Sequence, residues 1–172
     1  MDSQAHEPRI RIAIAISNFN GDITERLLKG ARARLAEDEV SVEDEDIVEA
    51  PGAFELPLIA QTLARTRMYD GIICLGCVIK GETAHFEYIS LSASWGLMTA
   101  SLNTQLPITF GILTTYTDAQ AEARSHDNAA NKGREAAEAC LRAIHVLNRI
   151  RDLVPTGGTS GAWDVLGLGL GW

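Results

Sequence analysis

The chain has few positive charges and lacks a long apolar run. Its 15 Lys and Arg residues are outnumbered by 23 Asp and Glu residues, which gives a formal net charge of −8 at pH 7. This excess of negative charge disfavours nucleic acid and anionic membranes as partners. No apolar stretch is long enough to cross a bilayer, and residues 1–8 lack the basic and apolar regions of a secretory signal. We therefore expect a cytoplasmic protein with no nucleic-acid partner and no membrane partner.

Cysteine is also scarce, with only Cys74, Cys77 and Cys140 in the sequence. Cys74 and Cys77 form a C-x-x-C pair, which in an α/β protein could be a redox motif. Redox pairs lie at helix N-termini, whereas this pair lies inside the apolar run 72–79, which is typical of a buried strand. We favour core cysteines over a redox pair, and we expect no metal site because no second Cys/His pair is near.

Three common motifs of nucleotide-binding and hydrolytic enzymes are missing. The sequence has no G-x-G-x-x-G after its first predicted strand, no G-x-x-x-x-G-K-[ST] and no G-x-S-x-G. Their absence disfavours a dinucleotide-binding fold, a P-loop enzyme and an α/β-hydrolase.

Apolar strands alternate with amphipathic helices along the chain. The predicted strands are 9–17, 42–50, 72–79 and 107–114, and the predicted helices are 23–35, 54–65, 86–102, 118–124 and 132–151. We expect Asp22 to cap the first helix. The alternation predicts an α/β fold, a three-layer αβα sandwich around a four-stranded parallel sheet.

One domain is predicted over 9–153, between a flexible N-terminus (1–8) and an atypical Gly/Trp-rich tail (154–172). The tail joins a glycine-rich linker to an apolar end with two tryptophans. It is either a disordered extension or a docking peptide, since exposed Trp and Leu are costly without a partner.

The segment 76–86 is the most informative stretch. An apolar strand runs into a polar turn and then a helix, whose unpaired N–H groups favour an anion. Thr83 can add a hydroxyl and His85 can move a proton near neutral pH, although His85 could also be a capping or packed residue. This combination suits chemistry on a phosphorylated small molecule.

Other candidate residues follow the remaining strands, because ligands of open α/β sheets bind at the carboxyl ends of the strands. Phe19 is either a core residue or a stacking surface for a planar ring. Glu55 either caps a helix or accepts hydrogen bonds from sugar-like hydroxyls. Arg124 and Lys132 are either plain surface charges or phosphate ligands.

These motifs together resemble the lumazine synthase family of riboflavin biosynthesis. The matching segments are 17–20 (SNFN), 51–57 (PGAFELP), 76–89, 107–114 and Arg124 followed by 131–133 (NKG), in family order. The resemblance implies a flavodoxin-like strand order, with an added N-terminal edge strand from a neighbouring subunit.

The resemblance also implies a reaction. Members of the family condense 5-amino-6-(D-ribitylamino)uracil with 3,4-dihydroxy-2-butanone 4-phosphate to 6,7-dimethyl-8-ribityllumazine, phosphate and water, with no cofactor. The amine forms a Schiff base with the ketone, phosphate is eliminated and the ring closes. Such chemistry needs orientation of two reactants and proton transfer.

Residue roles are carried over by position. His85 is the expected proton-transfer residue, and Glu82, Thr83 and Arg124 are expected to bind the phosphate. The expected substrate-binding residues are Phe19, Ala53, Phe54, Glu55, Cys77, Val78, Ile79, Phe110 and Lys132. The resemblance implies that Phe110, Arg124 and Lys132 come from the adjacent subunit.

The family forms pentamers, paired pentamers or sixty-subunit icosahedral capsids, and the resemblance makes riboflavin synthase a candidate partner. The sequence leaves these assemblies open, and a catalytically weak shell-forming or ligand-binding protein on the same fold is the alternative function. Asn18 stands where the family often has arginine, and Glu82 places a carboxylate at the phosphate turn.

Overall fold

The computed structural model describes residues 10–153, which form one parallel sheet and its covering helices. The elements in chain order are β1 (Ile12–Ser17), α1 (Gly21–Glu37), a 3₁₀ turn η1 (Asp44–Asp46), β2 (Ile47–Ala50), α2 (Leu56–Arg65), β3 (Gly71–Ile79), α3 (His85–Thr104), β4 (Ile108–Thr115), α4 (Asp118–Ser125) and α5 (Lys132–Asp152).

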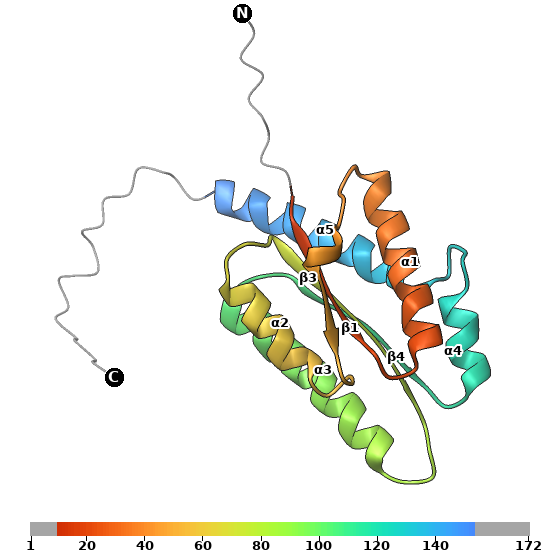
Figure 1. Cartoon of the computed structure of the whole chain (residues 1–172). Coiled ribbons are helices and arrows are strands. Elements are labelled where there is room, and N and C mark those ends of the chain that lie inside the picture. The colour runs from red at the N-terminus through yellow and green to blue at the C-terminus, as the bar shows by residue number, and fades with distance from the viewer. Residues whose placement is uncertain (1–9, 154–172) are drawn as a thin grey trace, which may run out of the picture.

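The sheet has the order β2-β1-β3-β4, and all three strand pairs are parallel. Helices α1, α4 and α5 cover one face, and α2 and α3 cover the other (Figure 1). The predicted α/β fold, its three layers and its flavodoxin-like order are therefore confirmed. β2 and β4 are the two edge strands.

Successive side chains of each strand point to opposite faces of the sheet, which divides the core into two layers. On β1, Ile12, Ile14 and Ile16 face the α1/α5 side, whereas Ala13 and Ala15 face the α2/α3 side. A parallel sheet covered on both faces needs apolar residues at every position, which explains the continuous apolar runs. The small alanines let α2 and α3 approach the sheet closely.

The structure of β3 supports the interpretation of Cys74 and Cys77 as core residues. Cys74 and Cys77 lie buried inside β3, and burial raises the pKa of the Cys77 thiol to about 11. Both thiols therefore stay protonated near neutral pH, unlike the nucleophile of a redox pair.

Two local predictions were wrong. The strand predicted at 42–50 is shorter, because the acidic run 44–46 forms a 3₁₀ turn before β2. Buried Asp46 accepts hydrogen bonds there from Arg11 (2.7 Å) and from the Tyr69 hydroxyl (3.0 Å). Asp22 does not cap α1, because Asn20 occupies the N-cap in the left-handed conformation and Asp22 lies in the first turn.

The predictions for the N-terminal segment 1–8 and for the tail 154–172 lie outside the described residues 10–153. The predicted edge strand from a neighbour concerns a second subunit. Within that range, no helix combines the length and apolar character of a membrane span.

Candidate active site

A pocket of about 530 Å³ opens at the carboxyl edge of the sheet, and we call it the Phe19 pocket. It lies where the loops after β1, β2 and β3 meet. Nine of the residues predicted for the site line it, namely Phe19, Ala53, Phe54, Glu55, Cys77, Val78, Ile79, Thr83 and His85. Segments far apart in the sequence therefore converge as predicted from the positions of the strand ends.

The β1–α1 turn presents the Phe19 ring to solvent. Phe19 is 69% exposed, so it is not a core residue. Its N–H donates to the Oγ of buried Ser17, and Asn20 next to it donates from its amide to the Cys77 carbonyl at 2.9 Å. Both contacts fix the turn while leaving the aromatic face free for stacking on a planar ring.

Glu55 lies at the N-cap of α2, but its side chain makes no capping hydrogen bond. Glu55 therefore does not cap α2 by a hydrogen bond, although its position places a carboxylate at the positive end of the helix dipole. The carboxylate folds over Gly52, where an added Cβ would lie 3.2 Å from Oε2. Since no hydrogen bond or ion pair occupies it within residues 10–153, the carboxylate can accept hydroxyl donors in the pocket.

His85 is the first residue of α3 and is exposed, so it is neither a packed histidine nor the N-cap, which is Ala84. Its N–H donates to the Thr83 Oγ at 3.4 Å. This bond uses the Thr83 oxygen as acceptor and leaves its hydroxyl hydrogen available to a ligand. Gly81 and Thr83 line the Phe19 pocket, whereas Glu82 between them lines neither pocket described here.

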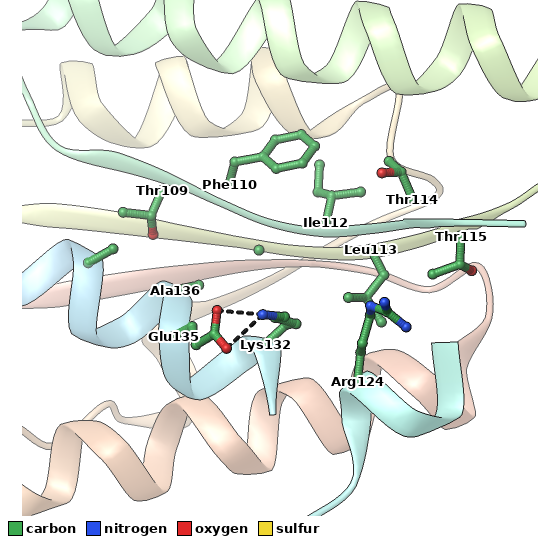
Figure 2. Close-up of a pocket in the computed structure, with 12 residues that line it drawn as sticks. Thr109, Phe110, Ile112, Leu113, Thr114, Thr115, Arg124, Lys132, Glu135 and Ala136 are labelled. Atoms are coloured by element: carbon green, nitrogen blue, oxygen red, sulfur yellow. Dashed lines mark hydrogen bonds and ion pairs between the residues drawn. The ribbon is translucent and has the colours of Figure 1, made fainter. Parts of the chain in front are cut away.

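A second pocket, of about 450 Å³, lies along the edge strand β4, and we call it the Arg124 pocket (Figure 2). Phe110, Arg124 and Lys132 line it together. Figure 2 shows Arg124 and Lys132 on the side of the sheet covered by α4 and α5, whereas Phe110 points toward α2 and α3. The two cations come from the end of α4 and the start of α5.

The cations of the Arg124 pocket differ in their partners. Lys132 Nζ contacts both carboxylate oxygens of Glu135 at 2.7 Å. Arg124 donates to the Gln120 carbonyl at 2.9 Å and makes no ion pair within residues 10–153. Arg124 therefore offers the less compensated charge to an anion, and Lys132 must leave Glu135 to bind one.

Sequence reasoning missed two residues of this pocket. Glu135 lies one turn after Lys132, a spacing that predicts the ion pair. Thr115 is 3% exposed, and its hydroxyl oxygen has no hydrogen-bond partner in the described residues. Its place at the end of β4, where ligands bind in such sheets, could have indicated it.

The two pockets share no lining residue. One offers an aromatic ring, a free carboxylate and an imidazole, and the other offers two cations and a hydroxyl. Among residues 10–153, no three His, Cys, Asp or Glu side chains come together as a metal site requires. Within one chain, the candidate residues therefore line two separate pockets of different chemistry.

Comparison with known proteins agrees with the family resemblance found in the sequence. A family profile described as 6,7-dimethyl-8-ribityllumazine synthase matches residues 9–148. The chain is 64% identical over 142 residues to 6,7-dimethyl-8-ribityllumazine synthase 1 of Caulobacter vibrioides, a match that covers 83% of the chain and 93% of that relative. It is 46% identical over 145 residues to the 6,7-dimethyl-8-ribityllumazine synthases of Yersinia pestis and Yersinia pseudotuberculosis, covering 84% of the chain and 93% of each relative.

Proposed function

The chain belongs to the 6,7-dimethyl-8-ribityllumazine synthase family, and we propose that it condenses 5-amino-6-(D-ribitylamino)uracil with 3,4-dihydroxy-2-butanone 4-phosphate. The products are 6,7-dimethyl-8-ribityllumazine, phosphate and water, in the penultimate step of riboflavin biosynthesis. The enzyme is a transferase. The match over most of the chain supports this activity.

The Phe19 pocket suits the uracil substrate. Phe19 stacks on the pyrimidine, and Glu55 accepts hydrogen bonds from the ribityl hydroxyls. The backbone of 53–54 and 77–79 borders the same space. The Cys77 carbonyl already accepts from Asn20, and the bond from the Lys80 N–H to the Thr115 carbonyl places the backbone groups of Val78 in the ladder with β4. The backbone of Ile79 is therefore the better partner for the substrate.

The phosphate substrate binds between the two halves. The turn at 81–84 offers Thr83, with Glu82 contributing its backbone N–H while its carboxylate stays outside. Arg124 and Lys132 meet the phosphate charge and Phe110 closes the site. His85, beside Thr83, carries the proton during Schiff-base formation and phosphate elimination.

The observation that carries the proposal is the separation of the two halves. A reaction between two substrates needs the ring, the imidazole and the cations in one place. Within one chain they line different pockets. We propose that a neighbouring subunit of a homo-oligomer brings its Arg124 pocket to the Phe19 pocket, as the resemblance implies.

The exposed face of α3 supports assembly. Large apolar side chains recur along it at intervals of three and four residues, and all are more than 60% exposed: Tyr88, Leu91, Trp95, Met98 and Leu102. Such a heptad stripe packs against copies of itself in helix bundles. A pentamer or a multiple of it follows from the family, and the association with riboflavin synthase and the cytoplasmic location stay predictions.

The direct test mixes the purified chain with both substrates and follows lumazine absorbance and phosphate release together. We expect both products to form in step, above the uncatalysed rate. Neither product above that rate would reject the synthase and favour a shell or ligand-binding protein on the same fold.

A further inference from the structure

Asn131 is a buried residue that lies between Arg124 and Lys132 in the sequence. It is 1% exposed and occupies the N-cap of α5, directly before Lys132. Ser125, which directly follows Arg124, is fully buried beside it. A buried polar side chain at this junction must find partners for all its polar atoms.

The amide nitrogen of Asn131 holds the end of α4. Nδ2 donates to the carbonyls of Ser125 at 2.8 Å and His126 at 3.1 Å. It also lies 3.1 Å from the carbonyl of Arg26 on α1. One side chain therefore joins the last turn of α4, which carries Arg124, to the middle of α1.

The amide oxygen of Asn131 holds the start of α5. Oδ1 accepts from the N–H groups of Gly133 at 2.8 Å and Arg134 at 3.2 Å. Both groups belong to the first turn of α5, where backbone N–H groups have no acceptor within the helix. The three carbonyls require a donor and the two N–H groups require an acceptor. A side-chain amide provides two N–H donors and an acceptor oxygen, whereas ionised Asp has no donor and Ser has only one, so neither replaces Asn fully.

Two glycines create the space that Asn131 occupies. A Cβ on Gly30 of α1 would lie 2.2 Å from Asn131 Oδ1, and one on Gly133 would lie 1.9 Å from the Leu27 carbonyl. The α1–α5 contact is therefore close enough to fix the Asn131 amide in one place.

We propose that Asn131 is a positioning residue that sets the separation of Arg124 and Lys132 and so shapes the phosphate-binding half of the site. This inference rests on the proposed function. Asn131 touches no substrate itself, and its effect reaches the reaction through the two cations on either side of it.

The experiment compares Asn131→Ser and Asn131→Asp with the unchanged protein. Both retain an oxygen that can cap α5, but Asp has no donor for the carbonyls of α4 and Ser has one hydroxyl donor in place of two N–H donors. We expect the KM for the ketone phosphate to rise about tenfold, the loss expected for one hydrogen bond to a charged group, with kcat changed by less than about threefold. The KM for the uracil substrate should stay unchanged.

Gly30→Ala provides a second variant, because its new methyl group displaces the Asn131 amide without changing Asn131. It should reproduce the rise in the KM for the ketone phosphate. If the Asn131 variants do not fold, this variant tests the positioning role in their place. Leu35→Ala, a buried change near the end of α1, is the matched control, which should lose stability with no change in KM.

Calorimetric titration with inorganic phosphate separates the two proposals. If the unchanged protein binds phosphate without turnover and the variants bind it more weakly, the positioning role holds and the proposed reaction is wrong. An unchanged KM and phosphate affinity in the folded variants, or an equal change in Leu35→Ala, would overturn the positioning role.

Discussion

His85 and Glu55 share an unusual property at the scale of single residues. Neither side chain makes a hydrogen bond or ion pair within residues 10–153, although both line a pocket of about 530 Å³. The sequence suggested both residues but left helix capping open for each. In the structure, Ala84 rather than His85 occupies the N-cap of α3, and Glu55 occupies the N-cap of α2 without a side-chain capping hydrogen bond.

We predict that His85→Ala lowers kcat about 10²–10⁴-fold, the usual contribution of a general acid or base. The expected KM values for both substrates stay within a few-fold of the original, because the imidazole is assigned proton transfer rather than binding. His145→Ala, an exposed change on α5, is the control. Steady-state kinetics measure both, and an unchanged kcat in His85→Ala would remove His85 from the mechanism.

At the scale of elements, the sequence located the four strands and five α-helices found within residues 10–153, and the largest error was at β2. The acidic run 44–46 was included in a predicted strand because apolar residues flank it, but Asp46 turns inward to Arg11 and Tyr69. Those partners lie 35 and 23 residues away in the sequence. Local patterns cannot contain such distant contacts, so the 3₁₀ turn was not predictable from them.

The α1–α5 contact is the element-scale feature that most directly supports the site. We predict that Gly133→Ala destabilises the protein by about 3 kcal/mol, because its methyl group would meet backbone rather than a movable side chain. Gly21→Ala is the control, since nothing lies within 4 Å of its new Cβ. Urea denaturation measures both, and equal stability of the two variants would show that the helices can separate without cost.

At the scale of the whole molecule, the candidate residues of one chain are divided between two pockets that share no lining residue. Phe19 and His85 lie in one, and Arg124 and Lys132 lie in the other. The exposed apolar stripe of α3 and the open edge of β4 are further surfaces that single chains leave uncovered. A shared site accounts for these features with one arrangement of subunits.

We predict that two inactive variants restore activity when they form mixed oligomers. His85→Ala keeps an intact Arg124 pocket, and Arg124→Ala keeps an intact Phe19 pocket. Random mixing of equal amounts gives about a quarter of the interfaces two intact halves, and activity should return to about that fraction. Co-expression followed by product assay measures it.

Mixing the two variants after separate assembly is the control, in which no recovery is expected. If co-assembled chains also show no recovery, each chain must complete its own site. The proposal that neighbouring subunits share the site would then be wrong.

The family resemblance, the order of elements and the candidate site residues were all available from the sequence alone. These follow from local periodicity and short motifs, such as the run from Gly76 to Phe86. Such patterns can be recognised without knowing which distant residues the segment contacts. The tertiary structure decided how these residues are grouped. It separated Arg124 from His85, gave Lys132 a partner in Glu135 and placed Asn131 among three helices. Distances between segments depend on how the helices pack on the sheet, and local patterns do not specify that packing.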